Sequence, residues 1–287
     1  LKFYTYIILM KGSEIDMASK IIRTYNGTII VPYYPKQMKQ LEYETSTYDR
    51  VYHKSIEITG FKMNYAGLPA FITHNQSEEY LKGSLPTYEI TTMDVIKPKN
   101  VMYDFSLNSD INPTDIQSDI INQIELDFRK SGRDAQKEWF VNLQTGFGKT
   151  LLSVYLVSVI KYKTLIMCFS TEILYQWAKT IHDKTNFDCD RLLLINNSKI
   201  LLNILEGKFN TDDFDIIMCT PGLIMSFAKK YGLESLEPLF TKMGIGLKIF
   251  DEAHRNKANI VKINALTNVK YTLYLSADFG QSDRDIE

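Results

Sequence analysis

A short stretch between two apolar runs has the residue types of a phosphate-binding loop. It ends in Lys149-Thr150, follows the apolar run 139–143 and precedes the apolar run 151–160, so it connects a predicted strand to a predicted helix. In such a loop the backbone N–H groups point at phosphate oxygens, the lysine supplies a positive charge, and the threonine hydroxyl binds Mg²⁺. The loop residues that would surround the phosphates are Gln144, Thr145, Gly146, Phe147 and Gly148. The general pattern has glycine where this chain has Leu143, and a chance Gly-Lys-Thr in a turn is the alternative.

Two adjacent carboxylates follow a second apolar run. Asp251 and Glu252 come directly after residues 247–250, and two buried acids are costly to desolvate unless a cation lies nearby. Mg²⁺ carried by a nucleotide would supply that cation, with Asp251 facing the metal and Glu252 reaching a water molecule. Alternatively, the two acids are solvated and begin a helix, where negative charge is favoured.

Composition limits the other kinds of site. The 287 residues hold 33 Lys and Arg against 34 Asp and Glu, so a wholly basic nucleic-acid surface is excluded and any such contact must be local. Three widely spaced cysteines argue against a disulfide framework or a zinc site and favour a reducing compartment such as the cytoplasm. His53, His74 and His182 lack metal-ligand spacing. The apolar stretch 3–10 is too short to span a membrane, and residues 1–16 are interpreted as an upstream segment.

The chain from residue 112 onward predicts an α/β fold. Asn112 would cap a helix that begins at Pro113 and presents one apolar face formed by Ile116, Ile120, Ile121, Ile124 and Phe128. Five apolar runs at 139–143, 164–169, 214–219, 247–250 and 272–275 alternate with helical patterns. Continuous apolar strands separated by helices indicate a mostly parallel sheet covered on both faces, which binds ligands at the carboxyl ends of its strands.

Residues 17–100 predict a small, strand-rich α+β accessory domain. Asn26-Gly27 between two β-branched runs predicts a hairpin with a type I′ turn, which needs positive φ at both residues. Further strands are expected at 51–59 and 87–92, and short helices at 35–43 and after Ser77, ending at Gly83. Residues 101–111 are interpreted as a linker to the second domain at 112–287.

The two chemical motifs together resemble those of superfamily 2 helicases and translocases: a Thr-Gly-x-Gly-Lys-Thr loop at 145–150 and Asp-Glu-Ala-His at 251–254. Three further stretches follow in that family's order: 170–177 resembles motif Ia, 220–222 resembles motif Ib, and 275–278 resembles motif III, with Asp278 in place of the usual threonine. The start of the loop and the pair Gln176-Trp177 look most like the phage UvsW-like and XPB-like branch of DNA helicases. The resemblance covers the first RecA-like domain only.

The resemblance implies a role for each matching residue. Lys149 would hold the γ-phosphate of ATP, Thr150 and Asp251 the Mg²⁺, and Glu252 the attacking water, while Gln117 would read the adenine. Ser276, Ala277 and Asp278 would join His254 in coupling the nucleotide state to the nucleic-acid strand. The residues that would grip the strand are Ser170, Thr171, Gln176, Thr220, Pro221 and Gly222.

The expected activity is therefore ATP-dependent translocation on nucleic acid, DNA rather than RNA. A second RecA-like domain, expected to supply an arginine to the transition state, has no counterpart in 1–287, so these residues are expected to bind ATP without strong nucleic-acid-stimulated hydrolysis. One alternative is the motor subunit of a restriction enzyme or a chromatin-type translocase. Another is a nucleotide-binding scaffold that does not hydrolyse.

Overall fold

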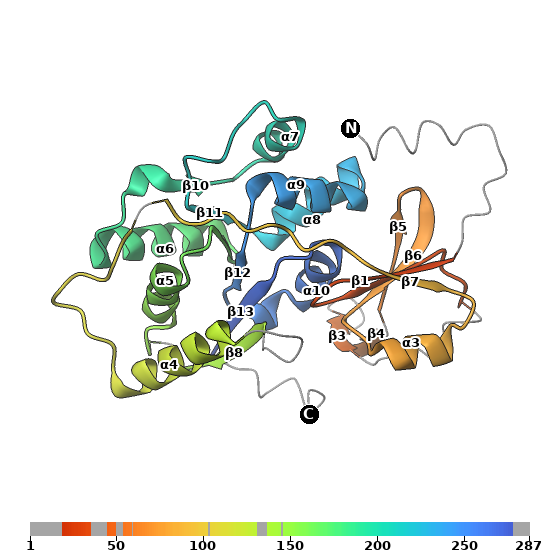
Figure 1. The fold of residues 1–287 in the computed structure, drawn as a ribbon, viewed down its shortest axis with the longest axis horizontal. Helices are drawn as coiled ribbons and strands as arrows, with labels where there is room; N and C mark the ends of the chain where they lie inside the picture. The colour runs from red at the N-terminus through yellow and green to blue at the C-terminus, as the bar shows by residue number, and fades with distance from the viewer. Residues whose placement is uncertain are drawn as a thin grey trace.

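The computed structural model describes residues 19–35, 45–49, 54–58, 60–102, 104–130, 137–144 and 146–277. Its strands form a five-stranded sheet, a two-stranded antiparallel pair and a six-stranded sheet (Figure 1). The five-stranded sheet has the order β5-β6-β2-β1-β7 and consists of β1 (Lys20–Arg23), β2 (Thr28–Val31), β5 (Phe61–Tyr65), β6 (Leu68–Thr73) and β7 (Glu89–Thr92). The separate pair is β3 (Thr45–Asp49) with β4 (Lys54–Ile58). Helix α3 (Glu78–Ser84) begins at the expected cap Ser77 but continues through Gly83.

The six-stranded sheet is entirely parallel, as the apolar runs predict. Its order is β10-β11-β9-β12-β13-β8, and its strands are β8 (Glu138–Asn142), β9 (Thr164–Met167), β10 (Leu192–Leu194), β11 (Ile216–Cys219), β12 (Leu247–Phe250) and β13 (Tyr271–Ser276). Strand β10 is not among the strands that the apolar runs predict. Its three residues are only half-buried, so they give a weak pattern.

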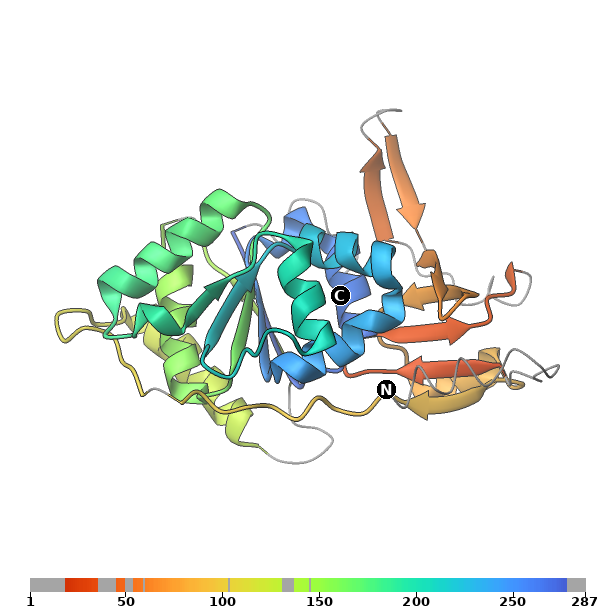
Figure 2. The same ribbon diagram turned by 90° about the horizontal axis from the view of Figure 1, so that it is seen from above.

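Helices cover both faces of this sheet (Figure 2). One face packs against α4 (Asp115–Arg129), α5 (Lys149–Ile160) and α6 (Thr171–Lys184). The other packs against α7 (Ser198–Glu206), α8 (Pro221–Tyr231), α9 (Leu236–Met243) and α10 (Lys257–Leu266). Single turns of 3₁₀ helix occur at η2 (Cys189–Arg191), η3 (Leu233–Ser235) and η4 (Ala253–Arg255). None of the described helices is long and apolar enough to cross a membrane. The arrangement is the predicted α/β, RecA-like fold.

The start of α4 corrects the expected cap. Thr114, not Asn112, is the N-cap, because its hydroxyl accepts from the backbone N–H of Gln117 while the Gln117 side chain accepts from the N–H of Thr114 at 2.9 Å. This reciprocal pair satisfies two helix-end donors at once, which a cap at Asn112 would not do. Ile116 is also off the buried face, with 53% of its surface exposed.

The hairpin formed by β1 and β2 is confirmed, but the predicted turn type is wrong. The loop has four residues, 24–27, closed by a hydrogen bond from the N–H of Thr24 to the carbonyl of Gly27, and neither Asn26 nor Gly27 has positive φ. The two-residue turn with positive φ occurs instead at Ala66-Gly67, between β5 and β6. Ala66 donates its N–H to the side chain of Glu234 in η3. This contact supports the turn, which lacks the Asn-Gly or Asp-Gly sequence that usually indicates one.

The five-stranded sheet shares a hydrophobic core with one face of the six-stranded sheet. Ile29, Val31, Ala70 and Ile72 pack in one apolar cluster with side chains of α7 to α10. The segment expected to be a linker is also packed, since Phe105 is buried and Asn108 donates its N–H to the carbonyl of Lys184 at the end of α6. The domain boundaries at residues 100 and 112 remain predictions, and the expected helix at 35–43 lies outside the described residues beyond Pro35.

Candidate active site

The motif residues gather at the carboxyl edge of the six-stranded sheet. The phosphate-loop sequence follows β8, the acids follow β12, and Ser276 ends β13. The motif Ia-like and Ib-like stretches follow β9 and β11, which are neighbours in the sheet. Because all six strands run parallel, segments far apart in the chain meet at one edge.

Lys149 lies between the loop and the acids. It is the first residue of α5 and is buried, with 8% of its surface exposed. Its Nζ donates to the carbonyl of Leu143 at 2.9 Å and lies 3.7 Å from Oε1 of Glu252. The backbone carbonyl of residue 143 therefore helps to hold the lysine, a contact that does not depend on glycine at that position.

Gln117 connects α4 to the loop. Its Nε2 donates to the carbonyl of Phe147 at 2.8 Å, in addition to its role in the α4 cap. Gly148 has φ of +74°, and a Cβ there would lie 2.5 Å from Nε2 of Gln117. Glycine at 148 suits the positive φ of the loop, and a Cβ there would also displace the Gln117 amide from the carbonyl of Phe147. Thr145 lies outside the described residues.

Asp251 is held by three hydrogen bonds. Its backbone N–H donates to the carbonyl of Met167 at 2.9 Å, which continues the pairing of β12 with β9. Its Oδ1 accepts from the N–H of Glu252 at 3.0 Å, and its Oδ2 accepts from the indole N–H of Trp177 at 2.7 Å. Burial raises the pKa of the Asp251 carboxyl, and the bond from Trp177 opposes that rise by favouring the charged form.

Glu252 adopts the left-handed conformation, with φ of +49°. That conformation costs about 1–2 kcal/mol for a residue with a side chain. It turns the chain sharply after β12, and the Glu252 carboxylate then lies between two basic groups, Lys149 and His254, whose Nδ1 is 3.4 Å from Oε2. Strain of this kind is often found at functional sites.

His254 connects the acids to β13. Its Nδ1 lies 2.7 Å from the hydroxyl of Ser276, and the carbonyl of Ser276 accepts from the N–H of Leu143 at 3.1 Å. Ser276 therefore contacts both the loop and the histidine, and its coupling role stays a prediction. Ala277 follows it at the sheet edge, and Asp278 lies outside the described residues.

Five of the six predicted nucleic-acid residues lie at the N-termini of α6 and α8, and the sixth, Gln176, lies in the second turn of α6. The hydroxyls of Ser170 and Thr220 cap these helices, and Pro221 is the first residue of α8. The caps give both hydroxyls a structural role in this state. Thr171 opens α6, and Gln176 and Gly222 are exposed.

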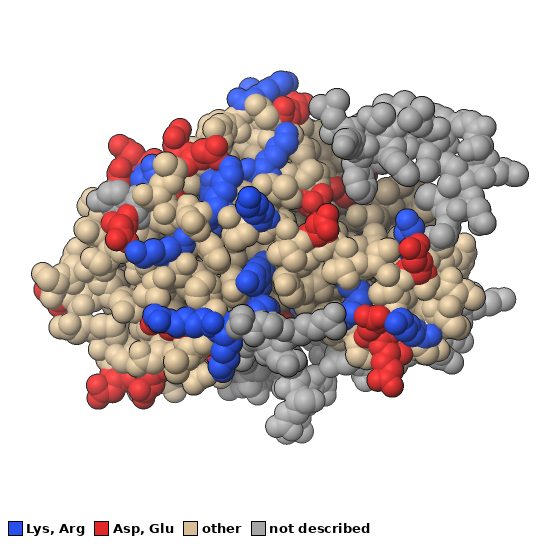
Figure 3. Space-filling model, viewed as in Figure 1, with Lys and Arg blue, Asp and Glu red and all other residues tan. Residues whose placement is uncertain are grey.

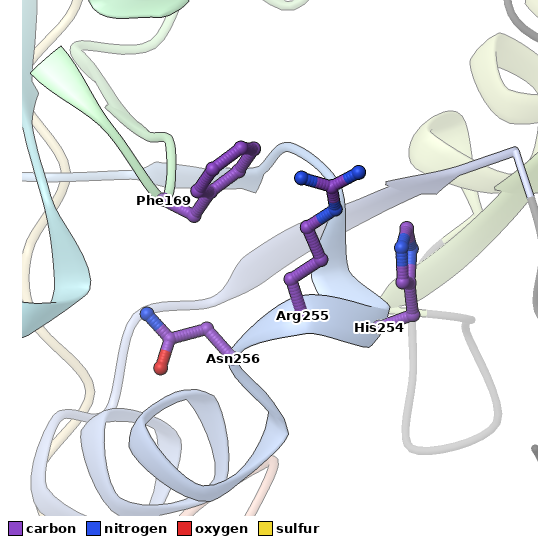
Figure 4. Close-up of a pocket in the computed structure, with 4 residues that line it drawn as sticks. All are labelled: Phe169, His254, Arg255 and Asn256. Carbon is purple, nitrogen blue, oxygen red and sulfur yellow. The ribbon is translucent and has the colours of Figure 1, made fainter.

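A pocket beside the acids is lined in part by residues that lie outside the predicted motifs. It has a volume of about 520 Å³ and is lined by Phe169, His254, Arg255 and Asn256. Figure 4 shows Arg255 extending toward Phe169, and its guanidinium carbon is 4.5 Å from the ring centroid. Arg255 forms no ion pair with any carboxylate in the part of the chain that the structure describes. Its position directly after the four-residue motif was the available signal.

The donor set fits a metal that arrives with a nucleotide. Among the described residues, no group of three or more His, Cys, Asp or Glu side chains could hold a metal ion by itself. Mg²⁺ is usually bound through one or two protein oxygens plus phosphates. Thr150, at the second position of α5, and the oriented Asp251 carboxylate are the candidate oxygens.

On the face seen in Figure 3, Lys and Arg side chains are interspersed with Asp and Glu and form no broad field of one sign.

Comparison with known proteins shows similarity to helicases. The chain is 27% identical over 99 residues to the "Probable helicase D10" of Escherichia phage T5, a match that covers 34% of this chain and 22% of that protein. Among solved structures, the UvsW helicase of bacteriophage T4 is 15% identical, covering 93% of this chain and 95% of that one with a TM-score of 0.49. The Hef helicase domain of Pyrococcus furiosus is 21% identical over 59% of this chain and 33% of that one, with a TM-score of 0.42.

A match to a family model covers all strands of the six-stranded sheet. Residues 110–280, more than half of the chain, match the ResIII family, described as "Type III restriction enzyme, res subunit". That range includes the phosphate loop, both acids and the stretches after β9, β11 and β13. This chain belongs to the ResIII family and carries its helicase-type domain.

Proposed function

We propose that this protein is an ATP-dependent helicase or translocase that acts on nucleic acid, with DNA as the preferred substrate. The observation that carries the proposal is the meeting of Lys149 with Glu252 at 3.7 Å, beside the oriented carboxylate of Asp251. A cation at a helix N-terminus next to two acids suits a phosphate chain with its metal. The preference for DNA is supported by the sequence resemblance.

The proposed hydrolysis assigns one task to each side chain. Lys149 and the N–H groups at the start of α5 would bind the β- and γ-phosphates, with Thr150 and Asp251 binding Mg²⁺. The metal, when bound, neutralises charge on the phosphates. Glu252 would orient a water molecule and accept its proton as the oxygen bonds to the γ-phosphorus and the bond to the β-phosphate oxygen breaks.

Coupling to the strand would pass through the edge of the sheet. His254 and Ser276 lie between the acids and the phosphate loop, so a change at the γ-phosphate would be felt at β13. We expect Gln117 to contact the adenine, and Ser170, Thr171, Gln176 and residues 220–222 to contact the strand backbone. These residues would hold a strand of any base sequence, because they would contact its phosphates. We propose that the protein acts in the cytoplasm.

Nucleotide binding gives the direct test. Calorimetry should detect ATP·Mg²⁺ binding to the wild type, weakened roughly 10- to 100-fold in Lys149→Ala because a charge-assisted bond worth about 1.5–3 kcal/mol is removed. Lys161→Ala, at the other end of the same helix, is the matched control and should bind normally. ATP turnover with single-stranded DNA or RNA then measures substrate preference. Undetectable ATP binding by the folded protein would refute the proposal. Since residues 1–287 are expected to show little turnover by themselves, the scaffold alternative would be favoured by ATP binding without turnover in a chain that also includes a second RecA-like domain.

A further inference from the structure

Trp177 makes a directional contact with the candidate metal site. It lies in the second turn of α6, and only 1% of its surface is exposed. An indole ring has one hydrogen-bond donor and no acceptor. That donor is directed at Oδ2 of Asp251, at 2.7 Å, across 74 residues of sequence.

This contact completes the restraint on the Asp251 carboxylate. The backbone of Asp251 is fixed by Met167, and Oδ1 accepts from the N–H of Glu252. Without the indole, only the hydrogen bond from Glu252 to Oδ1 would hold the Asp251 carboxylate, and the carboxylate could rotate about that hydrogen bond. Among the described residues, no other group donates to Oδ2. Each carboxylate oxygen has two acceptor sites, so both oxygens keep one available for a cation.

Helix α6 brings two kinds of residue together. Gln176, assigned above to the nucleic-acid strand, is exposed, while the adjacent Trp177 is buried and faces the acids. Ser170 and Thr171 begin the same helix directly after β9, the strand that pairs with β12. A rotation or shift of α6 on binding a strand would therefore move the indole relative to Asp251.

We propose that Trp177 is a positioning residue for the nucleotide-bound Mg²⁺, orienting Asp251 through its indole N–H and linking α6 to the metal. The inference rests on the proposed function, because it assigns Asp251 to the metal. It extends that function because it connects α6, the helix of the motif Ia-like stretch, directly to Asp251, with no nucleotide atom in between. A purely structural tryptophan would support the fold but would leave the metal dependence of binding unchanged.

Mg²⁺ dependence of ATP binding separates these two roles. In Trp177→Phe, which keeps an aromatic ring but lacks the donor, the Mg²⁺ concentration for half-maximal ATP binding should rise about 10-fold, the usual effect of losing a partner behind a metal ligand. Affinity for ATP without metal should change less than about 2-fold, because the phosphate-loop contacts are intact. Trp139→Phe is the matched control, since Trp139 is the other tryptophan, is also buried, and lies on β8.

Fluorescence gives a second measurement that keeps Trp177 in place. The chain has two tryptophans, so in Trp139→Phe the emission comes from Trp177 alone. Adding Mg²⁺ with ATP should change that emission, and adding ATP with EDTA should not, because only the metal engages Asp251. The change should disappear in the Trp139→Phe, Asp251→Asn double variant.

The outcomes distinguish this inference from the proposed function. If the wild type does not bind ATP, the proposed function fails. If the wild type binds ATP but Trp177→Phe shows wild-type Mg²⁺ dependence, only the positioning role is refuted. If Trp177→Phe does not fold, an emission from Trp177 that is indifferent to Mg²⁺ in Trp139→Phe refutes it equally.

Discussion

Two adjacent carboxylates at the end of β12 occupy different environments. Asp251 faces Trp177 and the strand, whereas Glu252, turned by its positive φ, faces Lys149 and His254. Since the two side chains have different partners, we propose different tasks for them: Asp251 would bind the metal and Glu252 the water molecule.

Replacing each acid by its amide should separate these tasks. Asp251→Asn should lose the enhancement of ATP affinity by Mg²⁺, because an amide oxygen is a poor substitute for a charged metal ligand. Glu252→Gln should keep Mg²⁺-dependent affinity within about 3-fold while any ATP turnover falls by about 10²-fold or more, because the proton acceptor is gone. Calorimetry with and without EDTA, together with phosphate release, measures both effects. Equal loss of metal dependence in both variants would contradict the division.

At the scale of the element, the phosphate loop contains two glycines with different constraints. Gly146 and Gly148 both have positive φ, of +89° and +74°. A Cβ at 146 would meet nothing within 4 Å, whereas one at 148 would meet Gln117 at 2.5 Å. The pair therefore separates backbone strain from the loss of the contact between α4 and the loop.

Alanine at each position provides the comparison. Both variants should lose about 1–2 kcal/mol in the free energy of unfolding, because alanine is strained at positive φ. Gly148→Ala should lose a further 1 kcal/mol or so through displacement of the Gln117 side chain, and its ATP affinity should fall more than that of Gly146→Ala. Denaturant unfolding and calorimetry measure the two quantities. Indistinguishable variants would show that the Gln117 contact has no role in the loop.

At the scale of the whole molecule, a buried polar chain crosses the six-stranded sheet. Lys248 donates to Asn264 of α10 at 2.6 Å, Asn264 donates to the hydroxyl of Tyr274 at 2.6 Å, and Tyr274 donates to Glu138 at 2.6 Å. The chain joins β12, α10, β13 and β8. Burial lowers the pKa of Lys248 to about 7.

The lowered pKa of Lys248 predicts a pH-dependent contribution to stability. Between about pH 7 and 10.5 the unfolded chain keeps this lysine protonated while the folded chain releases the proton, so its contribution rises with pH. The slope is at most about 1.4 kcal/mol per pH unit. Lys248→Met should remove that rise, so the difference in unfolding free energy between wild type and variant should change between about pH 7.5 and 9. Denaturant unfolding at these pH values tests this, and a constant difference would be the contrary result.

The first sheet depends on a close approach to α10. A Cβ on Gly27 would lie 2.4 Å from the Cα of Ala265, and the Thr24 hydroxyl donates to the carbonyl of Asn264. The side chain of Asn268 also bridges the sheet, accepting from the N–H of Tyr25 and donating to the carbonyl of Met93.

Gly27→Ala should therefore destabilise the molecule by about 1–3 kcal/mol through overpacking. Gly83→Ala is the matched control, because a Cβ at 83 would meet nothing within 4 Å and alanine favours the helix. Hydrogen exchange should show faster exchange in β1 and β2 of Gly27→Ala. Slow exchange there with unchanged stability would mean that α10 shifts to accept the methyl group.

Five of the six strands of the parallel sheet, and the residues that lie at its carboxyl edge, could be predicted from the sequence alone. Buried parallel strands are continuous apolar runs, so the local sequence pattern predicts β9, β11 and β12. The residues that follow these strands must then meet at one edge of the sheet. The tertiary structure decided what depends on contacts between distant segments. The bond from Trp177 to Asp251, the four-residue turn at 24–27 and the short strand β10 all follow from packing against other elements, which no local pattern records. The same reason explains why Thr114 rather than Asn112 begins α4: its cap partner Gln117 also reaches across to the carbonyl of Phe147, so the helix start is fixed together with the loop it supports.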